Sequence, residues 1–208
     1  MKTTHTSRMF VLALALALPA TSRADWPVVD WISQKLHGGT SSGEAAALET
    51  KPPAPGTPYV QMATSPDGGA LALLLGVILS AKYTIRIAAY EFTSRPIAKA
   101  LLDAERRGVS VMVVMDRSQL SQRYTSATFL ANAGIPVRID SRYPIQHSKV
   151  MVVDGQTVET GSMNYTDAGT SKNSENVLVV WYHPTLARQY NEYWQKLWDE
   201  SQPYMVRS

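Results

Sequence analysis

The chain has 208 residues, 20 lysines and arginines, 17 aspartates and glutamates, and no cysteine. Its length suffices for one domain with a full-sized hydrophobic core. The lack of cysteine excludes disulfide bonds, thiolate metal sites and thiol nucleophiles, so histidine, lysine, carboxylates and hydroxyls remain as candidate reactive groups.

Residues 1–24 have the pattern of a secretory signal peptide. Lys2 and Arg8 precede an apolar run, Phe10–Leu18, and small residues lead up to Ala24. The run has about half the length needed to cross a bilayer. We therefore predict cleavage after Ala24 and a periplasmic or secreted protein. Cleavage removes three basic residues and no acidic one, so the mature chain has no formal net charge and must hold an anionic substrate with a local basic cluster.

Residues 25–57 are predicted to precede the folded domain. Asp25–His37 places apolar residues at roughly helical spacing, which favours a short amphipathic helix. Gly38–Pro58 is rich in glycine, serine, alanine and proline, a composition typical of a linker. The domain is therefore expected to span residues 58–208.

The first half of this domain alternates strand and helix patterns. The patterns predict strands at residues 59–63, 84–92, 109–115 and 135–139, and helices at residues 70–82, 95–107 and 126–133. This alternation predicts one α/β domain with a mixed, largely parallel β-sheet and helices on both faces. Beyond Gln146 the pattern becomes strands joined by tight turns. A closing helix is predicted at residues 184–200, and its aromatic stripe is expected to pack on the core.

Polar residues cluster around a predicted hairpin in the second half. Val150–Val153 favours a strand, and residues two apart on a strand point to the same face, so His147 and Lys149 are expected side by side. Asp154-Gly155 is typical of a tight hairpin turn. The hairpin would bring a second polar pair, Ser162 and Asn164, next to the first.

Imidazole, ammonium and carboxamide groups in one pocket suit a phosphodiester. Cationic and amide donors stabilise charge on the nonbridging oxygens, and a histidine can attack phosphorus. A carboxylate that accepts the other ring proton fixes the tautomer of such a histidine, and Glu175 is the candidate here.

The spacing H-x-K-x₄-D-x₆-G-S-x-N resembles the signature of the phospholipase D superfamily. Its fixed positions are occupied by His147, Lys149, Asp154, Gly161, Ser162 and Asn164. Glu175 matches the acidic residue that follows the motif in the bacterial periplasmic endonuclease branch, and the resemblance extends from about Tyr59 to Asp199.

The resemblance implies the phospholipase D/nuclease fold and a two-step displacement without metal or cofactor. One histidine attacks phosphorus, and a second protonates the leaving oxygen and then activates water. It implies catalytic roles for His147, Lys149, Asn164 and Glu175. Ser162, Asp154 and Gly161 are implied as substrate-binding or supporting residues.

Only one copy of the motif is present, whereas larger family members carry two. The other histidines, His5, His37 and His183, are not followed by lysine two residues later. The resemblance therefore implies a homodimer in which His147 of a second subunit supplies the second histidine.

Basic residues elsewhere suggest a groove for a phosphate backbone. Asp116, Arg117 and Arg123 follow a central strand, where ligands of open α/β sheets bind, and Arg138, Arg142 and Lys172 are further candidates.

The small single-motif domain, the export signal and the resemblance to periplasmic endonucleases favour DNA, and also RNA, as substrate. No base-reading motif is visible, which suits cutting without sequence preference. Two alternatives remain: a phospholipase that removes lipid headgroups, and a nucleic-acid-binding accessory of an envelope DNA-transfer system.

Overall fold

The computed structural model describes residue 54, residues 56–122 and residues 124–206. Eight strands form one sheet in the order β1-β7-β6-β5-β2-β3-β4-β8. The strands are β1 (Tyr59–Ser65), β2 (Thr84–Ala89), β3 (Ser110–Asp116), β4 (Val137–Asp140), β5 (Lys149–Val153), β6 (Thr157–Gly161), β7 (Glu175–Trp181) and β8 (Gln202–Pro203). The helices are α3 (Ala70–Ser80), α4 (Arg95–Arg106), α5 (Ser126–Asn132), α6 (Asp167–Ser171), α7 (Pro184–Glu200) and the 3₁₀-helix η1 (Arg117–Leu120).

The predicted α/β domain with helices on both faces of a mixed sheet is confirmed, and one part of that prediction is corrected. Among the described strands, β2 pairs with β3 and β3 with β4 in parallel, while every other neighbouring pair is antiparallel. The sheet is therefore mostly antiparallel. The βαβ alternation ends at β4, and β5, β6 and β7 then follow one another as antiparallel neighbours.

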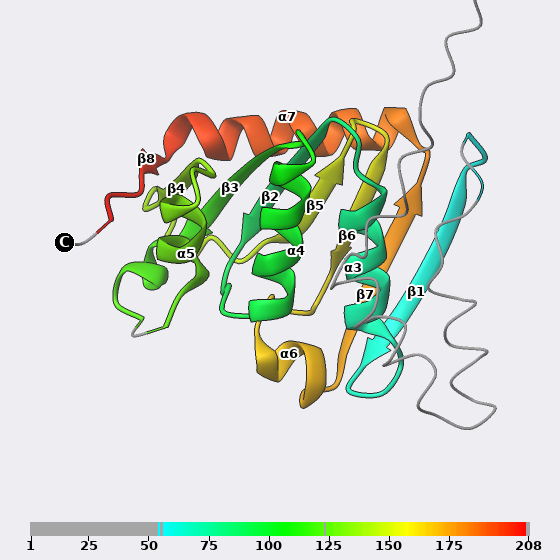
Figure 1. Ribbon diagram of the computed structural model, residues 1–208, viewed down its shortest axis with the longest axis horizontal. Coiled ribbons are helices and arrows are strands. Elements are labelled where there is room, and N and C mark those ends of the chain that lie inside the picture. Colours follow the sequence, from blue (N-terminus) through cyan, green and yellow to red (C-terminus); the bar gives the residue numbers. More distant parts are fainter. Residues whose placement is uncertain (1–53, 55, 123, 207–208) are drawn as a thin grey trace, which may run out of the picture.

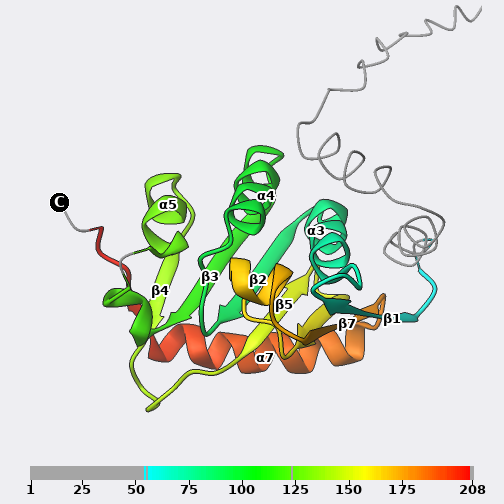
Figure 2. The ribbon, with the colours of Figure 1, turned by 90° about the horizontal axis from the view of Figure 1, so that it is seen from below.

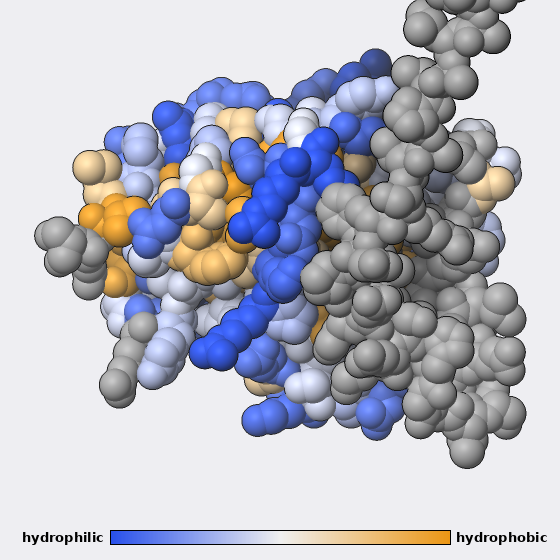
Figure 3. Space-filling model, in the orientation of Figure 1, coloured by the Kyte–Doolittle hydropathy of each residue, from blue (hydrophilic) through white to orange (hydrophobic). Residues whose placement is uncertain are grey.

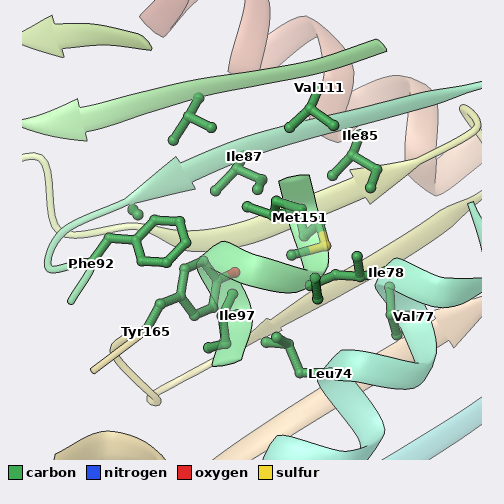
Figure 4. Packing of buried hydrophobic residues seen from close by; sticks show 14 of the residues in the cluster. Leu74, Val77, Ile78, Ile85, Ile87, Phe92, Ile97, Val111, Met151 and Tyr165 are labelled. Carbon is green, nitrogen blue, oxygen red and sulfur yellow. The ribbon is translucent and has the colours of Figure 1, made fainter. Parts of the chain in front are cut away.

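The helices lie in two layers with the sheet between them. Figure 2 shows α3, α4 and α5 over one face and α7 alone across the other. α3 is buried over most of its surface, so its sequence is apolar nearly all round, whereas α4 is amphipathic and begins with a proline in its first turn. The main core lies between these helices and the sheet, with Phe92 and Tyr165 at one end and Val111 and Ile85 further along (Figure 4).

α7 covers the opposite face through the predicted aromatic stripe. Trp194 and Leu197 pack on Ala88 and Val114, and the indole N–H of Trp194 donates to the carbonyl of Ile87 at 2.8 Å. Trp198 stacks on Trp194 with ring centroids 5.1 Å apart. The expectation that this stripe packs on the core is therefore confirmed.

The predicted helices and strands are found within a few residues of their expected ends. η1, α6 and β8 were not predicted, because each has five residues or fewer and leaves no measurable periodicity. The predicted signal peptide, amphipathic segment and most of the linker lie outside the described residues. Within the described chain, no helix combines the length and apolar character that crossing a membrane requires.

Candidate active site

The polar residues before β5 and after β6 lie at the same edge of the sheet. Strand register places Lys149 opposite Ala89, the last residue of β2, and Gly161 opposite Val177 near the start of β7. The edge where β2 ends is therefore also the edge where β5 begins and β6 ends. In Figure 1 it is the lower edge, next to α6.

His147 and Lys149 share one aromatic neighbour, Tyr90. The ring centroids of His147 and Tyr90 are 4.6 Å apart, and the Lys149 Nζ lies 5.0 Å from the Tyr90 centroid. The prediction that the two side chains lie side by side is confirmed. The His147 side chain is exposed, whereas Lys149 is buried, so the imidazole faces the solvent and the ammonium forms the floor beside it.

The segment that carries His147 is anchored on both sides. The buried carboxylate of Asp116 accepts a hydrogen bond from the Gln146 N–H at 2.7 Å. The Tyr90 N–H donates to the Ser148 carbonyl at 2.9 Å. Backbone bonds one residue before and one residue after His147 therefore fix the position of its Cα. Asp116, which the sequence suggested as part of a ligand crevice, has this anchoring role.

Lys149 is a desolvated cation that faces two carboxylates. Its Nζ donates to the His147 carbonyl at 2.9 Å. Burial lowers the pKa of the Lys149 ammonium, and the charges of Glu175 and Glu91 oppose that shift. A cation with few competing water contacts attracts a phosphate oxygen more strongly than an exposed lysine does.

Glu175 is held by Ser162 and not by His147. The Ser162 hydroxyl donates to a Glu175 oxygen at 2.5 Å, and the Asn173 amide donates to the other oxygen at 3.1 Å. The predicted hydrogen bond between Glu175 and His147 is not among the contacts of the described chain. Glu175 lies in the site, near Lys149, but orientation of the imidazole stays a prediction.

Gly161 has a packing role at this point. A Cβ on Gly161 would lie 2.2 Å from the Asn176 carbonyl oxygen, far inside contact distance. The close approach of β6 to β7 lets the Ser162 N–H donate to that same carbonyl at 3.1 Å. Glycine therefore allows Ser162 and Glu175 to meet, which is a supporting role.

Asn164 enters the site from the other side. Its amide donates to Glu91 at 3.4 Å, and its Oδ1 is buried without a hydrogen-bond partner. The next residue, Tyr165, fixes this position, because its N–H donates to the Glu91 carbonyl and its own carbonyl accepts from Thr93 and Ser94.

A buried acid, Glu159, holds the Tyr165 side chain in the core. The Tyr165 hydroxyl donates to Glu159 at 2.6 Å, and both side chains are buried in the main core. Burial raises the pKa of Glu159 to about 8, and the hydrogen bond from Tyr165 opposes the shift. Glu159 is therefore a neutral acid over much of the range in which the protein would work.

Asp154 lies at the far end of β5. Its carboxylate accepts hydrogen bonds from the backbone N–H groups of Lys82, Tyr83 and Thr84 at 2.8–2.9 Å. Asp154 and Gly155 both have positive φ, of 52° and 62°, as the predicted tight turn requires. The length of β5 separates Asp154 from Lys149, and the backbone contacts of Asp154 favour the supporting role.

The sequence profile of the family described as "Cardiolipin synthase, PLD-like domain" matches residues 74–198, more than half of the chain. The chain belongs to the phospholipase D-like family. The crystal structure of Nuc from Salmonella typhimurium, itself described as a phospholipase D family member, superposes with a TM-score of 0.70 at 47% identity. The match covers 73% of this chain and all of Nuc.

More distant relatives agree on the fold and differ in name. NucT from Helicobacter pylori has a TM-score of 0.66 at 23% identity, which shows a shared fold. A phospholipase D of Rickettsia bellii is 37% identical over 130 residues, and a mitochondrial cardiolipin hydrolase of Xenopus laevis is 33% identical over 134 residues. These matches cover 62% and 64% of this chain, and 64% and 63% of the relatives, so the chain spans less than two thirds of either.

The suggested basic groove is only partly assembled in this phospholipase D-like domain. Arg138 donates to the Trp198 carbonyl at 2.6 Å and stacks on that ring, so it packs against α7. Arg142 is exposed and close enough to Glu200 to influence its charge. Arg117 and Lys172 are exposed directly after β3 and α6, at the edge of the sheet where Lys149 lies. Arg123 lies outside the described residues.

Tyr90 and Glu91 are site residues that the sequence reasoning missed. They directly follow β2, and residues after the carboxyl end of a buried strand are where open α/β sheets bind ligands. The sequence pattern instead predicts one continuous strand over residues 84–92, which hides the end of β2 at Ala89. Their real position, past the end of the strand, turns Tyr90 toward His147 and Glu91 toward Asn164.

Proposed function

We propose that the protein is a metal-independent phosphodiesterase that cuts DNA without sequence preference, and RNA by the same chemistry. The observation that supports this most directly is the packing of exposed His147 and buried Lys149 against one ring, Tyr90. The arrangement offers a nucleophile to solvent above a fixed positive charge, and the Asn164 amide lies at the same edge of the sheet.

The proposed reaction has two displacements. An imidazole nitrogen of His147 attacks phosphorus, the bond to the leaving oxygen breaks, and that oxygen takes a proton from a second histidine. A water molecule then gives its proton to the second histidine and attacks phosphorus, which releases His147. Lys149 and Asn164 stabilise the negative charge on the nonbridging oxygens in both steps.

The second histidine is proposed to be His147 of another copy of this chain, in a homodimer. A mixing experiment tests this sharply. If wild-type chains and His147→Ala chains are refolded together, a shared site predicts activity that falls with the square of the wild-type fraction. A linear fall, or full activity of a species that sediments as a monomer, would contradict the shared site.

Nucleic acid is proposed over lipid because the match to Nuc covers that whole protein at 47% identity. The relatives named phospholipase D and cardiolipin hydrolase are less similar, and this chain spans less than two thirds of them. Those names nevertheless make lipid hydrolysis the second candidate, and a nucleic-acid-binding accessory the third.

The test uses purified chain starting at Asp25, plasmid and single-stranded DNA, and excess EDTA. His147→Ala should abolish cleavage. His183→Asn is the matched control, because exposed His183 caps α7 through its Nδ1 and asparagine can replace that cap. Parallel assays follow hydrolysis of phosphatidylcholine and cardiolipin vesicles. Lipid cleavage without DNA cleavage would replace the nuclease proposal, and DNA binding without any cleavage would favour the accessory.

Export to the periplasm or beyond is also proposed, from the predicted signal peptide. Mass spectrometry of the protein recovered from the periplasmic fraction should give a chain that begins at Asp25. Recovery of the uncleaved chain from the membrane fraction would contradict it.

A further inference from the structure

A large pocket opens between α4 and α5, and its walls do not include the candidate active-site residues. Its volume is about 1180 Å³, and α4, η1, α5 and the C-terminal Tyr204 contribute to its walls. Phe129 and Leu120 line it with 47% and 40% of their surfaces exposed. Figure 3 shows apolar surface on the α5 side of the blue ridge formed by α4.

Cations line the α4 wall of this pocket. Arg95, Lys99 and Arg106 of α4 line the pocket. Lys99 pairs with Asp103 at 2.7 Å and Arg106 with the same carboxylate at 3.5 Å. Within the described chain, Arg95 has no carboxylate partner. The pocket therefore suits a ligand that has a flat apolar part and negative charge beside it.

Gln119 adds a hydrogen-bond donor that lacks a partner. This residue is 1% exposed and lines the pocket. Its Oε1 accepts from the Phe92 N–H at 3.3 Å and from the Thr125 hydroxyl at 3.0 Å, which fixes the amide orientation. Its Nε2 is buried with no hydrogen-bond partner. A buried donor without a partner is costly, and an acceptor on the edge of a ligand would satisfy it.

None of the candidate active-site residues lines the pocket, but one chain segment joins the two places. Thr93 lines the pocket, while Glu91, two residues earlier, contacts Asn164 in the site. Two residues separate their Cα atoms by at most about 7.6 Å. Phe92, between them, donates to Gln119. One short stretch of a bound strand can therefore reach both places.

We propose that this pocket binds an unstacked base of a single-stranded nucleic acid while a neighbouring phosphodiester of the same strand lies at His147. The inference rests on the proposed nuclease function. Phe129 supplies an aromatic stacking surface, Arg95 attracts the backbone phosphate, and the Gln119 amide donates to an acceptor on the base edge. Single-stranded substrate is favoured because a base in a duplex cannot enter a pocket without leaving the stack.

An acyl chain fits the same pocket less well. Hydroxyl and amide groups from Thr93, Gln119, Ser121, Gln122 and Thr128 line it. A hydrocarbon would leave the buried Gln119 Nε2 without an acceptor, which opposes binding. A base offers ring nitrogens and carbonyl oxygens to the same groups.

The test compares Phe129→Ala with the wild-type mature chain. The substrates are a single-stranded oligonucleotide, the same oligonucleotide with abasic residues, and methyl p-nitrophenyl phosphate, which has no base. Loss of one stacked base should raise KM for the normal oligonucleotide about tenfold. Cleavage of the abasic strand and of the small diester should be unchanged. Phe129→Tyr keeps the ring and should restore the wild-type KM.

Tyr83→Ala is the matched control, because Tyr83 is a 71% exposed aromatic residue at the opposite edge of the sheet. It should leave every rate unchanged. Equal KM values for Phe129→Ala and wild type on the normal oligonucleotide would overturn the pocket proposal alone. Hydrolysis of the small diester without any oligonucleotide cleavage by wild type would overturn the nuclease function itself. An effect of Phe129→Ala confined to phosphatidylcholine vesicles would assign the pocket to acyl chains and overturn base binding.

Discussion

The two ends of β5 carry parts of one sequence motif but do different work. At one end, Lys149 is buried with a backbone carbonyl as its hydrogen-bond acceptor, beside an exposed His147. At the other end, Asp154 accepts three backbone hydrogen bonds that join the β5–β6 turn to the start of β2. The polar groups at the first end are left available to a substrate, whereas those at the second end are satisfied within the fold.

Residues of one motif therefore have different roles. Groups that stabilise a developing charge in a substrate cannot also be fully satisfied by the protein. A carboxylate that accepts three N–H groups has little capacity left for a ligand. The comparison predicts that substitutions at the two ends separate activity from stability.

Lys149→Met should give the largest effect, on activity. Loss of a preorganised cation at the phosphate oxygens is expected to lower kcat/KM for a phosphodiester about 10²–10³-fold. The free energy of unfolding should stay constant or rise, because burial already lowers the pKa of this lysine and methionine fills a similar volume. Hydrolysis of methyl p-nitrophenyl phosphate and urea unfolding measure the two quantities.

Lys82→Met is the control for that experiment, since Lys82 is exposed at the Asp154 end of the sheet. It should change neither quantity. A Lys149→Met enzyme with wild-type kcat/KM would show that Lys149 does not stabilise charge on the phosphodiester.

Asp154→Ala should show the reverse pattern. Three N–H groups lose a charged acceptor and alanine disfavours the positive φ at this position, so the free energy of unfolding should fall by about 2–3 kcal/mol. Asp154→Asn should lose less, because asparagine keeps an oxygen acceptor and tolerates that φ. At a temperature where the variant is folded, kcat should match wild type. A loss of kcat in fully folded protein would place Asp154 in the chemistry.

Glu159 should make the free energy of unfolding depend on pH. Its pKa of about 8 in the folded chain lies above the ordinary 4.5. Between these values the folded chain holds a proton that the unfolded chain has released, so stability falls as pH rises. The expected loss is about 1.4 kcal/mol between pH 6 and pH 7.

Glu159→Gln cannot titrate and should lack this component. Urea unfolding of both proteins at pH 5, 6, 7 and 8 gives the difference between their stabilities, which cancels other titrating groups. A difference that is constant with pH would show that Glu159 has an ordinary pKa.

Glu91→Gln should give the smallest effect, on substrate affinity. Removing a negative charge beside Asn164 and Lys149 is expected to lower KM for a singly charged diester about threefold. Doubly charged inorganic phosphate should inhibit about tenfold more strongly at pH 8, because its attraction changes by twice as much. Glu192→Gln, at an exposed position on α7, is the control. Unchanged inhibition by phosphate would show that Glu91 does not face the bound anion.

Much of this molecule follows from the sequence. Val150–Val153 and Asp154-Gly155 determine a strand and a tight turn through local backbone preferences, which need no distant partner. The spacing of His147 and Lys149 likewise predicted that they lie side by side, because strand periodicity is a local rule.

Only the tertiary structure decided what these residues touch. Tyr90 and Glu91 reach the site because β2 pairs with β5, a partner about 60 residues away that no local pattern specifies. This pairing is one of five antiparallel pairs in a sheet expected to be largely parallel. Another, between β6 and β7, joins Glu175 to Ser162. Local sequence sets backbone direction and side-chain face, whereas strand order, and with it the neighbours of each polar group, is set by which pairing buries the most apolar surface.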